Sequence, residues 1–98
     1  MRTPKNWRKN KKARAQIEHA KRRFAERHRL IVNDHMLMEF VSQIQKGKAI
    51  FIKKQSTRIR LFKIKHEEEW YPVVYDKQRK AIVTTLTNEM IDKGDVYE

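Results

Sequence analysis

The hydrophobic pattern of the chain changes at Gly47, and this change limits the fold more than any other feature of the sequence. Before Gly47, apolar residues recur every three or four positions, as on one face of an amphipathic helix. After it, short segments rich in Ile, Val, Phe, Tyr and Thr alternate with polar turns, which is the pattern of β-strands. The first half of the chain is therefore predicted to be helical and the second half to form a sheet.

Two helices are expected before Gly47. The first, over residues 13–29, is predicted from an apolar stripe with Lys and Arg around the rest of its surface. The stripe comprises Ala13, Ile17, Ala20 and Phe24. The second helix, over residues 34–46, follows Asn33, whose side chain suits the N-cap position. It ends at Gly47, where a residue that readily adopts a left-handed conformation is favoured.

Four strands are expected after Gly47, over residues 49–54, 57–66, 70–76 and 81–87. Their connections are too short for parallel crossovers, so the strands should be antiparallel neighbours. Pro72 lacks a backbone N–H and is therefore expected at a strand start, a bulge or an outward-facing edge position. The predicted fold class is α+β, with two N-terminal helices packed on one face of a four-stranded antiparallel sheet. The opposite face would then be free for a ligand.

Residues 13–98 are predicted to form a single domain, preceded by a basic, flexible N-terminal arm over residues 1–12. The chain has 24 Lys and Arg against 12 Asp and Glu. Residues 1–30 hold twelve of those cations and two Glu, a net charge of +10, so most of the excess is N-terminal. Such a segment binds phosphates through counterion release without reading sequence. The alternative is a tail that only keeps the chain in solution.

The partner predicted from this charge is a nucleic acid, with RNA favoured over DNA. Cations would contact the phosphates, and an exposed tryptophan on the arm could stack on a base. The residues predicted to bind the nucleic acid are Arg2, Lys5, Trp7, Arg8, Lys9, Lys11, Lys12, Arg14 and Arg58.

Several classes of protein are excluded by what the sequence lacks. Without cysteine there is no disulfide, no thiolate nucleophile and no Cys-based zinc site, which fits a reducing compartment such as the cytoplasm. No apolar run approaches the length of a membrane span. Glycine-rich phosphate loops, HExxH and G-x-S-x-G are missing. The acidic residues at 67–69 crowd a turn and do not form a magnesium site. No metal and no cofactor are expected.

A metal-free set of His, Arg and Thr side chains remains for chemistry. His19, Arg23 and Arg27 follow at four-residue spacing, hence on one flank of the first helix. A histidine can take a proton from a ribose 2′-hydroxyl while guanidiniums hold the phosphate. Arg60 lies on the second strand and Thr84 within the last. A solvated histidine and a threonine suited to a strand are the structural alternatives. The histidines with weaker claims are His28, His35 and His66.

The order of these residues resembles that of small bacterial and phage domains. The matching segments are HAKRRFAERH at 19–28, a helix ending in Gly47, an Arg-bearing strand, VVYD at 73–76 and IVTTL at 82–86. Those domains are similar to the ribonuclease superfamily that joins barnase, EndoU, the tRNase colicins and the RelE-type toxins. The resemblance covers about residues 17–87. It implies two helices on a four-stranded antiparallel sheet and metal-independent RNA cleavage in a cleft on that sheet.

The resemblance also implies catalytic roles for five residues. His19 would be the general base or acid, and Arg23 and Arg27 would hold the phosphate. Arg60 would contact the phosphate from a strand, and Thr84 would supply a hydroxyl. The first expectation for function is therefore a metal-independent endoribonuclease or toxin-like RNA-cleaving domain that acts on RNA, including ribosomal RNA in the ribosome.

Two other functions remain open at the level of sequence. The chain could be a non-catalytic RNA- or DNA-binding protein of the same fold, with arm and sheet forming a polyanion groove. It could also be a phage-type protein that binds and inhibits a host enzyme by occupying its nucleic-acid site. Cleavage requires His19 or an equivalent base, whereas inhibition requires a tight protein partner; an antitoxin is a further partner that the resemblance suggests.

Overall fold

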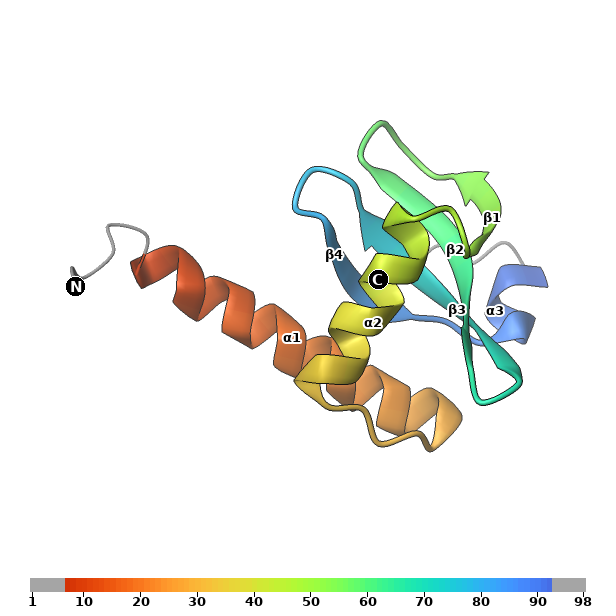
Figure 1. Ribbon diagram of the computed structural model, residues 1–98, viewed down its shortest axis with the longest axis horizontal. Coiled ribbons are helices and arrows are strands. Elements are labelled where there is room, and N and C mark those ends of the chain that lie inside the picture. The colour runs from red at the N-terminus through yellow and green to blue at the C-terminus, as the bar shows by residue number, and fades with distance from the viewer. Residues whose placement is uncertain (1–6, 93–98) are drawn as a thin grey trace.

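Four antiparallel strands form one sheet in the order β1-β2-β3-β4, in a computed structural model that describes residues 7–92, with side chains from Arg14 onward (Figure 1). Each strand pairs with its neighbour in the chain, so the sheet is a simple meander, as predicted. The strands are β1 (Ile50–Lys54), β2 (Ile59–His66), β3 (Glu69–Asp76) and β4 (Ala81–Thr85).

Two helices precede the sheet and cover one of its faces, which confirms the predicted α+β class. Helix α1 (Trp7–His28) projects beyond the sheet at its N-terminal end, and α2 (Asp34–Gln45) crosses the sheet (Figure 1). The core between helices and sheet includes buried side chains from α1, α2, β2, β3 and β4. Its largest fully buried members are Phe24, Phe40, Ile64 and Val73.

The start of α1 differs from the prediction by six residues, because the helix begins at Trp7 rather than at Ala13. The apolar stripe marks only the part of a helix that packs on the core. Lys and Arg have good helix propensity, so the helix continues past its last packed residue. Residues 7–12 of the expected flexible arm are thus helical, and residues 1–6 lie outside the described residues.

The predicted ends of α2 are correct within one residue, and so are their physical causes. The Asn33 side chain accepts a hydrogen bond of 2.8 Å from the backbone N–H of Met36, which satisfies one of the unpaired donors of the first turn. Gly47 has a φ of +76°, the left-handed conformation that ends the helix.

A third helix, α3 (Asn88–Asp92), covers part of the sheet face opposite α1 and α2 and is not among the predicted elements. The Thr87 hydroxyl accepts a 3.1 Å hydrogen bond from the N–H of Met90, so Thr87 caps this short helix. Met90 and Ile91 pack on a second small core. The expectation that this face is wholly free for a ligand is therefore wrong.

A bulge in β4 decides which face the last two threonines occupy. Val74 pairs with Thr84 and Tyr75 with Ile82, so Val83 is an extra residue. Because directly paired residues share a face, Thr84 lies on the α3 side with Val74. Thr85 lies on the side of α1.

Candidate nucleic-acid interface

His19, Arg23 and Arg27 occupy one flank of α1, as their spacing predicted, but each has neighbours on its own helix or on β4. The Arg22 guanidinium lies 3.5 Å from Nδ1 of His19. Arg23 forms a 2.9 Å ion pair with Glu26. Arg27 donates a 2.6 Å hydrogen bond from Nη1 to the carbonyl of Thr85.

Arg60 and Thr84, the strand members of the predicted catalytic set, are not brought to that flank. Arg60 donates from Nη1 to the carbonyls of Ser56 and Thr57, at 2.7 Å each, and so closes the β1–β2 turn. The Thr84 side chain is buried on the face opposite α1, and its hydroxyl has no hydrogen-bond partner among the described residues. The five residues therefore do not form one site.

His28 is the histidine that contacts the last strand. Its Nε2 lies 2.9 Å from the carbonyl oxygen of Leu86 and 3.0 Å from the hydroxyl of Thr85. Its ring packs edge-on against Tyr71, with 4.9 Å between centroids. Desolvation lowers the pKa of His28, assisted by the positive charge of Arg27, against the opposing effect of the bond to Leu86.

This contact explains how Pro72 is tolerated inside β3. Leu86 donates its N–H to the Pro72 carbonyl at 3.1 Å, and in an antiparallel pair of this kind the proline would return a bond to the Leu86 carbonyl. Proline has no N–H, and His28 supplies the missing donor. Because a carbonyl only accepts, Nε2 carries the proton and is not free to act as a base. His28 is therefore a structural residue.

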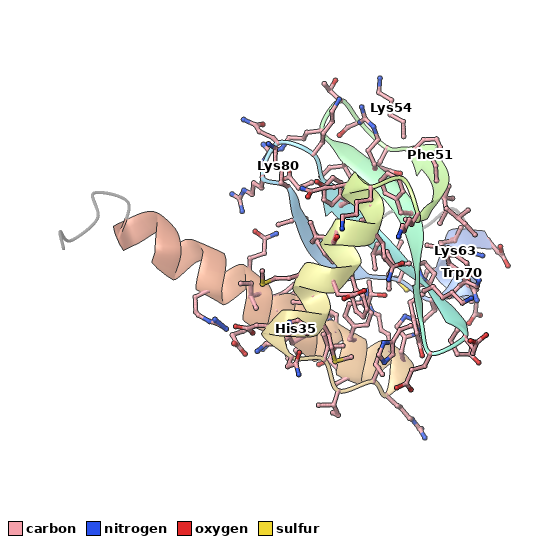
Figure 2. All side chains as sticks on the ribbon, viewed as in Figure 1. His35, Phe51, Lys54, Lys63, Trp70 and Lys80 are labelled. Carbon is pink, nitrogen blue, oxygen red and sulfur yellow. The ribbon has the colours of Figure 1, made fainter. Side chains whose placement is uncertain are left out.

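Apart from the N-terminal residues, positive charge is concentrated at one end of the sheet, which we call the basic end. In a meander the β1–β2 and β3–β4 turns lie at the same end, and Figure 2 labels Lys54 and Lys80 there. The opposite end carries the β2–β3 turn with its glutamates. The basic end comprises seven cations and one carboxylate: Lys53, Lys54, Arg58, Arg60, Lys77, Arg79, Lys80 and Asp76.

Asp76 organises the basic end from a buried position. It accepts hydrogen bonds from Arg58 at 2.8 and 3.2 Å, and from the backbone N–H groups of Gln78 and Arg79 at 2.9 and 3.1 Å. Burial alone would raise the pKa of this carboxyl, but the hydrogen bonds outweigh burial and the pKa is lowered. Asp76 thus holds the β3–β4 turn in shape and neutralises one cation.

The lysines at the basic end are left without such partners. Lys54, Lys77 and Lys80 are exposed, and none forms an ion pair within residues 14–92. Lys80 has a φ of +56°, so its side chain stands on the tight β3–β4 turn. Exposed ammonium groups without a carboxylate partner at the same end of the sheet make a surface suited to phosphates.

The residues predicted to bind nucleic acid fall into three groups: two form ion pairs, two lie outside the described residues, and five belong to the first turns of α1. Arg14 is bonded to Asp34 at 2.8 Å and to Glu18 at 3.1 Å, and it shares Asp34 with Lys21, so it joins α1 to α2. Arg58 is paired with Asp76. Arg2 and Lys5 lie outside the described residues. The backbone of α1 includes Trp7, Arg8, Lys9, Lys11 and Lys12.

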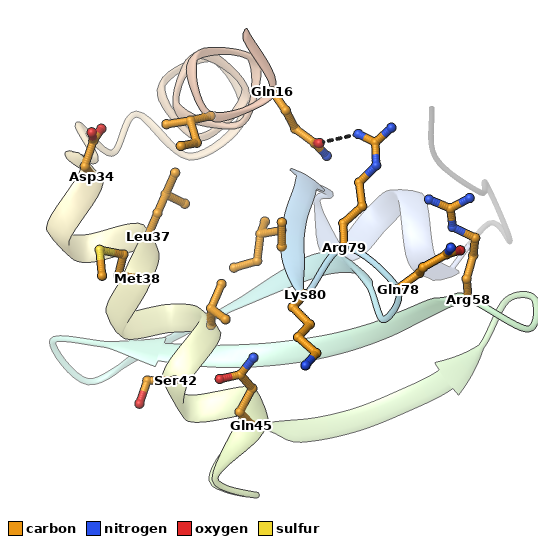
Figure 3. A pocket seen from close by; sticks show the side chains of 14 residues that line it. Gln16, Asp34, Leu37, Met38, Ser42, Gln45, Arg58, Gln78, Arg79 and Lys80 are labelled. Carbon is orange, nitrogen blue, oxygen red and sulfur yellow. Dashed lines mark hydrogen bonds between the residues drawn. The ribbon is translucent and has the colours of Figure 1, made fainter. Parts of the chain in front are cut away.

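Beside the basic end lies a groove between α1, α2 and the β3–β4 hairpin, with a volume of about 1110 Å³ (Figure 3). Its floor is aliphatic and includes Ile17, Leu37, Val41 and Ile82. At its rim, Arg79 donates a 2.7 Å hydrogen bond to Oε1 of Gln16, which ties the hairpin to α1.

Comparisons with known proteins place no further constraint on this site. No family model, no curated protein sequence and no solved structure matches the chain. Within residues 7–92, no cluster of three or more His, Asp or Glu is arranged to hold a metal ion. No helix in that range is long and apolar enough to cross a membrane. The class that fold and surface define is a small α+β protein with a strongly basic end, and its likeness to the ribonuclease superfamily stays a prediction.

Proposed function

We propose that the protein binds RNA through the basic end of its sheet, together with the cationic N-terminal turns of α1. The observation that carries the proposal is the separation of charge along the strands. Seven cations and one carboxylate occupy one end. At the other end the exposed Glu67, Glu68 and Glu69 stand beside Lys65, which pairs with Glu68 at 4.0 Å. A polyphosphate chain is the partner that such a surface attracts.

The proposal places part of the expected basic arm on a helix. Residues 8–12 contribute four Lys and Arg to the first turns of α1, which projects from the body. Figure 1 places this projecting helix and the β3–β4 hairpin on the same side of the molecule. An RNA strand could contact both. RNA rather than DNA and ribosomal RNA as the target rest on the resemblance to the ribonuclease superfamily. A cytoplasmic setting rests on the absence of cysteine from the sequence.

A pair of matched double variants tests the proposal. Lys54→Gln with Lys80→Gln removes two cations from the basic end. The control variant, Lys65→Gln with Arg29→Gln, removes two cations away from the basic end. It matches the first variant in backbone setting, because Lys65 lies on a strand like Lys54 and Arg29 has a φ of +55° like the +56° of Lys80. The two proteins have the same net charge, so general electrostatic attraction is held constant.

Binding of a fluorescent single-stranded RNA is measured over a salt series. Loss of two phosphate contacts should lower the slope of log K against log salt by about 1.4, which is about 25-fold in affinity near 0.1 M salt. The control should lose far less. Equal losses in both variants would reject the basic end as the contact surface, and a parallel titration with DNA of the same sequence tests the choice of RNA.

Cleavage of the bound RNA is a second proposal. It is favoured by the position of His19 on the same flank of α1 as Arg23 and Arg27, and by the Arg22 guanidinium, which lies 3.5 Å from Nδ1 of His19. Such a flank can hold a phosphate while the imidazole moves a proton. Purified protein with total RNA in EDTA should give cuts ending in 2′,3′-cyclic phosphate, and His19→Ala should slow them about 10²- to 10⁴-fold. Equal cleavage by His19→Ala and the parent would reject His19 as the catalytic group, and no cleavage by the parent would leave binding as the function.

A further inference from the structure

Six apolar residues line the groove beside the basic end, and the other eight lining residues are polar or charged. The apolar residues are Ile17, Leu37, Met38, Val41, Ala81 and Ile82. Met38 is 70% exposed, although it stands at the edge of this groove with Val41 and Ala81 nearby. A methionine is flexible and polarisable, and it adapts to the shape of an apolar partner. The groove therefore has the features of a docking surface rather than of a packed core.

Polar groups gather at the hairpin end of the same groove. Arg58, Arg79 and Lys80 line it there, and glutamines from α1, α2 and the hairpin stand around the rim (Figure 3). Asp34 is the carboxylate in the lining, and it is already bonded to Arg14 and Lys21. An occupant thus meets an apolar floor and a positive end.

The lining also distinguishes between kinds of occupant. None of the residues that line the groove is aromatic, so it offers no ring on which a base could stack. Aliphatic side chains flanked by cations complement a helix that has apolar residues on one face and carboxylates beside them. A segment of protein fits these features better than a nucleotide does.

We infer that this groove binds an acidic amphipathic helix of a partner protein, with apolar side chains against Met38, Val41 and Ala81 and carboxylates facing Arg79 and Lys80. The inference goes beyond RNA binding and does not depend on it. The aliphatic floor supplies the affinity, and the cations at the hairpin fix the direction in which the helix lies.

The test uses the full chain and a designed helical peptide of about four turns. Its leucines recur at helical spacing along one face, glutamates flank them, and a fluorescent label reports binding by anisotropy. Two control peptides accompany it: one with lysine in place of every glutamate, and one with the same composition in an order that scatters the leucines around the helix.

Two protein variants of equal chemistry locate the binding surface. Met38→Glu places a carboxylate in the groove, whereas Ile31→Glu places one at a loop residue that is 79% exposed and outside it. Both residues are largely in solvent, so neither change should unfold the chain. Met38→Glu should lower the affinity for the leucine–glutamate peptide about ten- to hundred-fold, as expected for the loss of one buried apolar contact. Ile31→Glu should leave its affinity unchanged.

The outcomes separate this inference from its alternatives. Saturable binding of the leucine–glutamate peptide alone, lost in Met38→Glu, supports a helical acidic partner. Equal binding of the scattered peptide reduces the effect to charge and overturns the inference. A parent chain that dimerises on gel filtration and becomes monomeric in Met38→Glu assigns the groove to a second copy. Loss of RNA affinity in Met38→Glu, with no peptide binding to the parent, assigns it to RNA.

Discussion

Replacing His28 should lower the free energy of unfolding, because His28 supplies a hydrogen bond to the backbone carbonyl of Leu86. In His28→Phe the ring remains, but the Leu86 carbonyl, which now accepts from Nε2 at 2.9 Å, loses its donor. Leaving a buried acceptor unpaired costs about 1–3 kcal/mol of unfolding free energy. The Thr85 hydroxyl keeps its 2.5 Å bond to the Pro72 carbonyl and cannot make up the loss.

His28→Gln reverses the comparison, since it keeps a donor and removes the ring. The contacts with Tyr71 and Phe24 are lost, at a cost of about 0.5–1.5 kcal/mol. Urea unfolding followed by circular dichroism measures both variants, with His35→Phe at an exposed position as control. If His28→Phe is as stable as the parent, the idea that His28 compensates for Pro72 is wrong.

Three further predictions concern protonation, the two threonines and the N-terminal residues. The pKa of His28 in the folded state lies below its ordinary 6.5, so the unfolded state binds more protons and stability should fall as the pH drops below about 6.5. Loss of stability through the carboxylates Asp34 and Asp76, whose pKa values are lowered, should begin only below about 3.8. In urea titrations at a series of pH values, His28→Gln should lack the first of these two declines. Thr84→Val should be neutral or stabilising by up to about 1 kcal/mol, because the buried Thr84 hydroxyl has no partner among the described residues. Thr85→Val should cost about 1–2 kcal/mol, because it removes the hydrogen bond to the Pro72 carbonyl. Equal effects of the two changes on urea unfolding would contradict the assigned faces. Deleting residues 1–12 should flatten the salt dependence of RNA binding, and an unchanged slope would exclude them as contacts.

The architecture was predictable because local features of the sequence mark where the helices and strands begin and end. The change of hydrophobic period at Gly47, the cap at Asn33 and the short connections each act locally, so they could be interpreted without knowledge of the tertiary structure. Helix α1 was placed too short for the same reason. Apolar spacing reports where a helix packs, and α1 continues beyond its packing surface. The five residues of α3 are too few for a periodic pattern to show.

The candidate site was less predictable because it depends on register and on which elements meet. A one-residue bulge at Val83 exchanges the faces of Thr84 and Thr85, and strict alternation along β4 gives no sign of it. His28 was ranked below His19 because its role depends on Pro72, 44 positions away in the sequence. The basic end, by contrast, is predictable from the sequence. Once four antiparallel strands are assumed, the residues at 53–58 and 77–80 must share one end.

The separation of charge along the strands also makes the molecule an electric dipole. A polyanion acts on such a dipole at distances beyond direct contact, up to about a Debye length, near 10 Å at 0.1 M salt. The torque turns the hairpins toward the phosphates and the glutamate turn away from them before the surfaces meet. Orientation is then selected during diffusion, so a larger fraction of encounters is productive and the association rate should depend on ionic strength more steeply than the dissociation rate. On the proposed function, a bound molecule would present the glutamate turn on the side away from the nucleic acid.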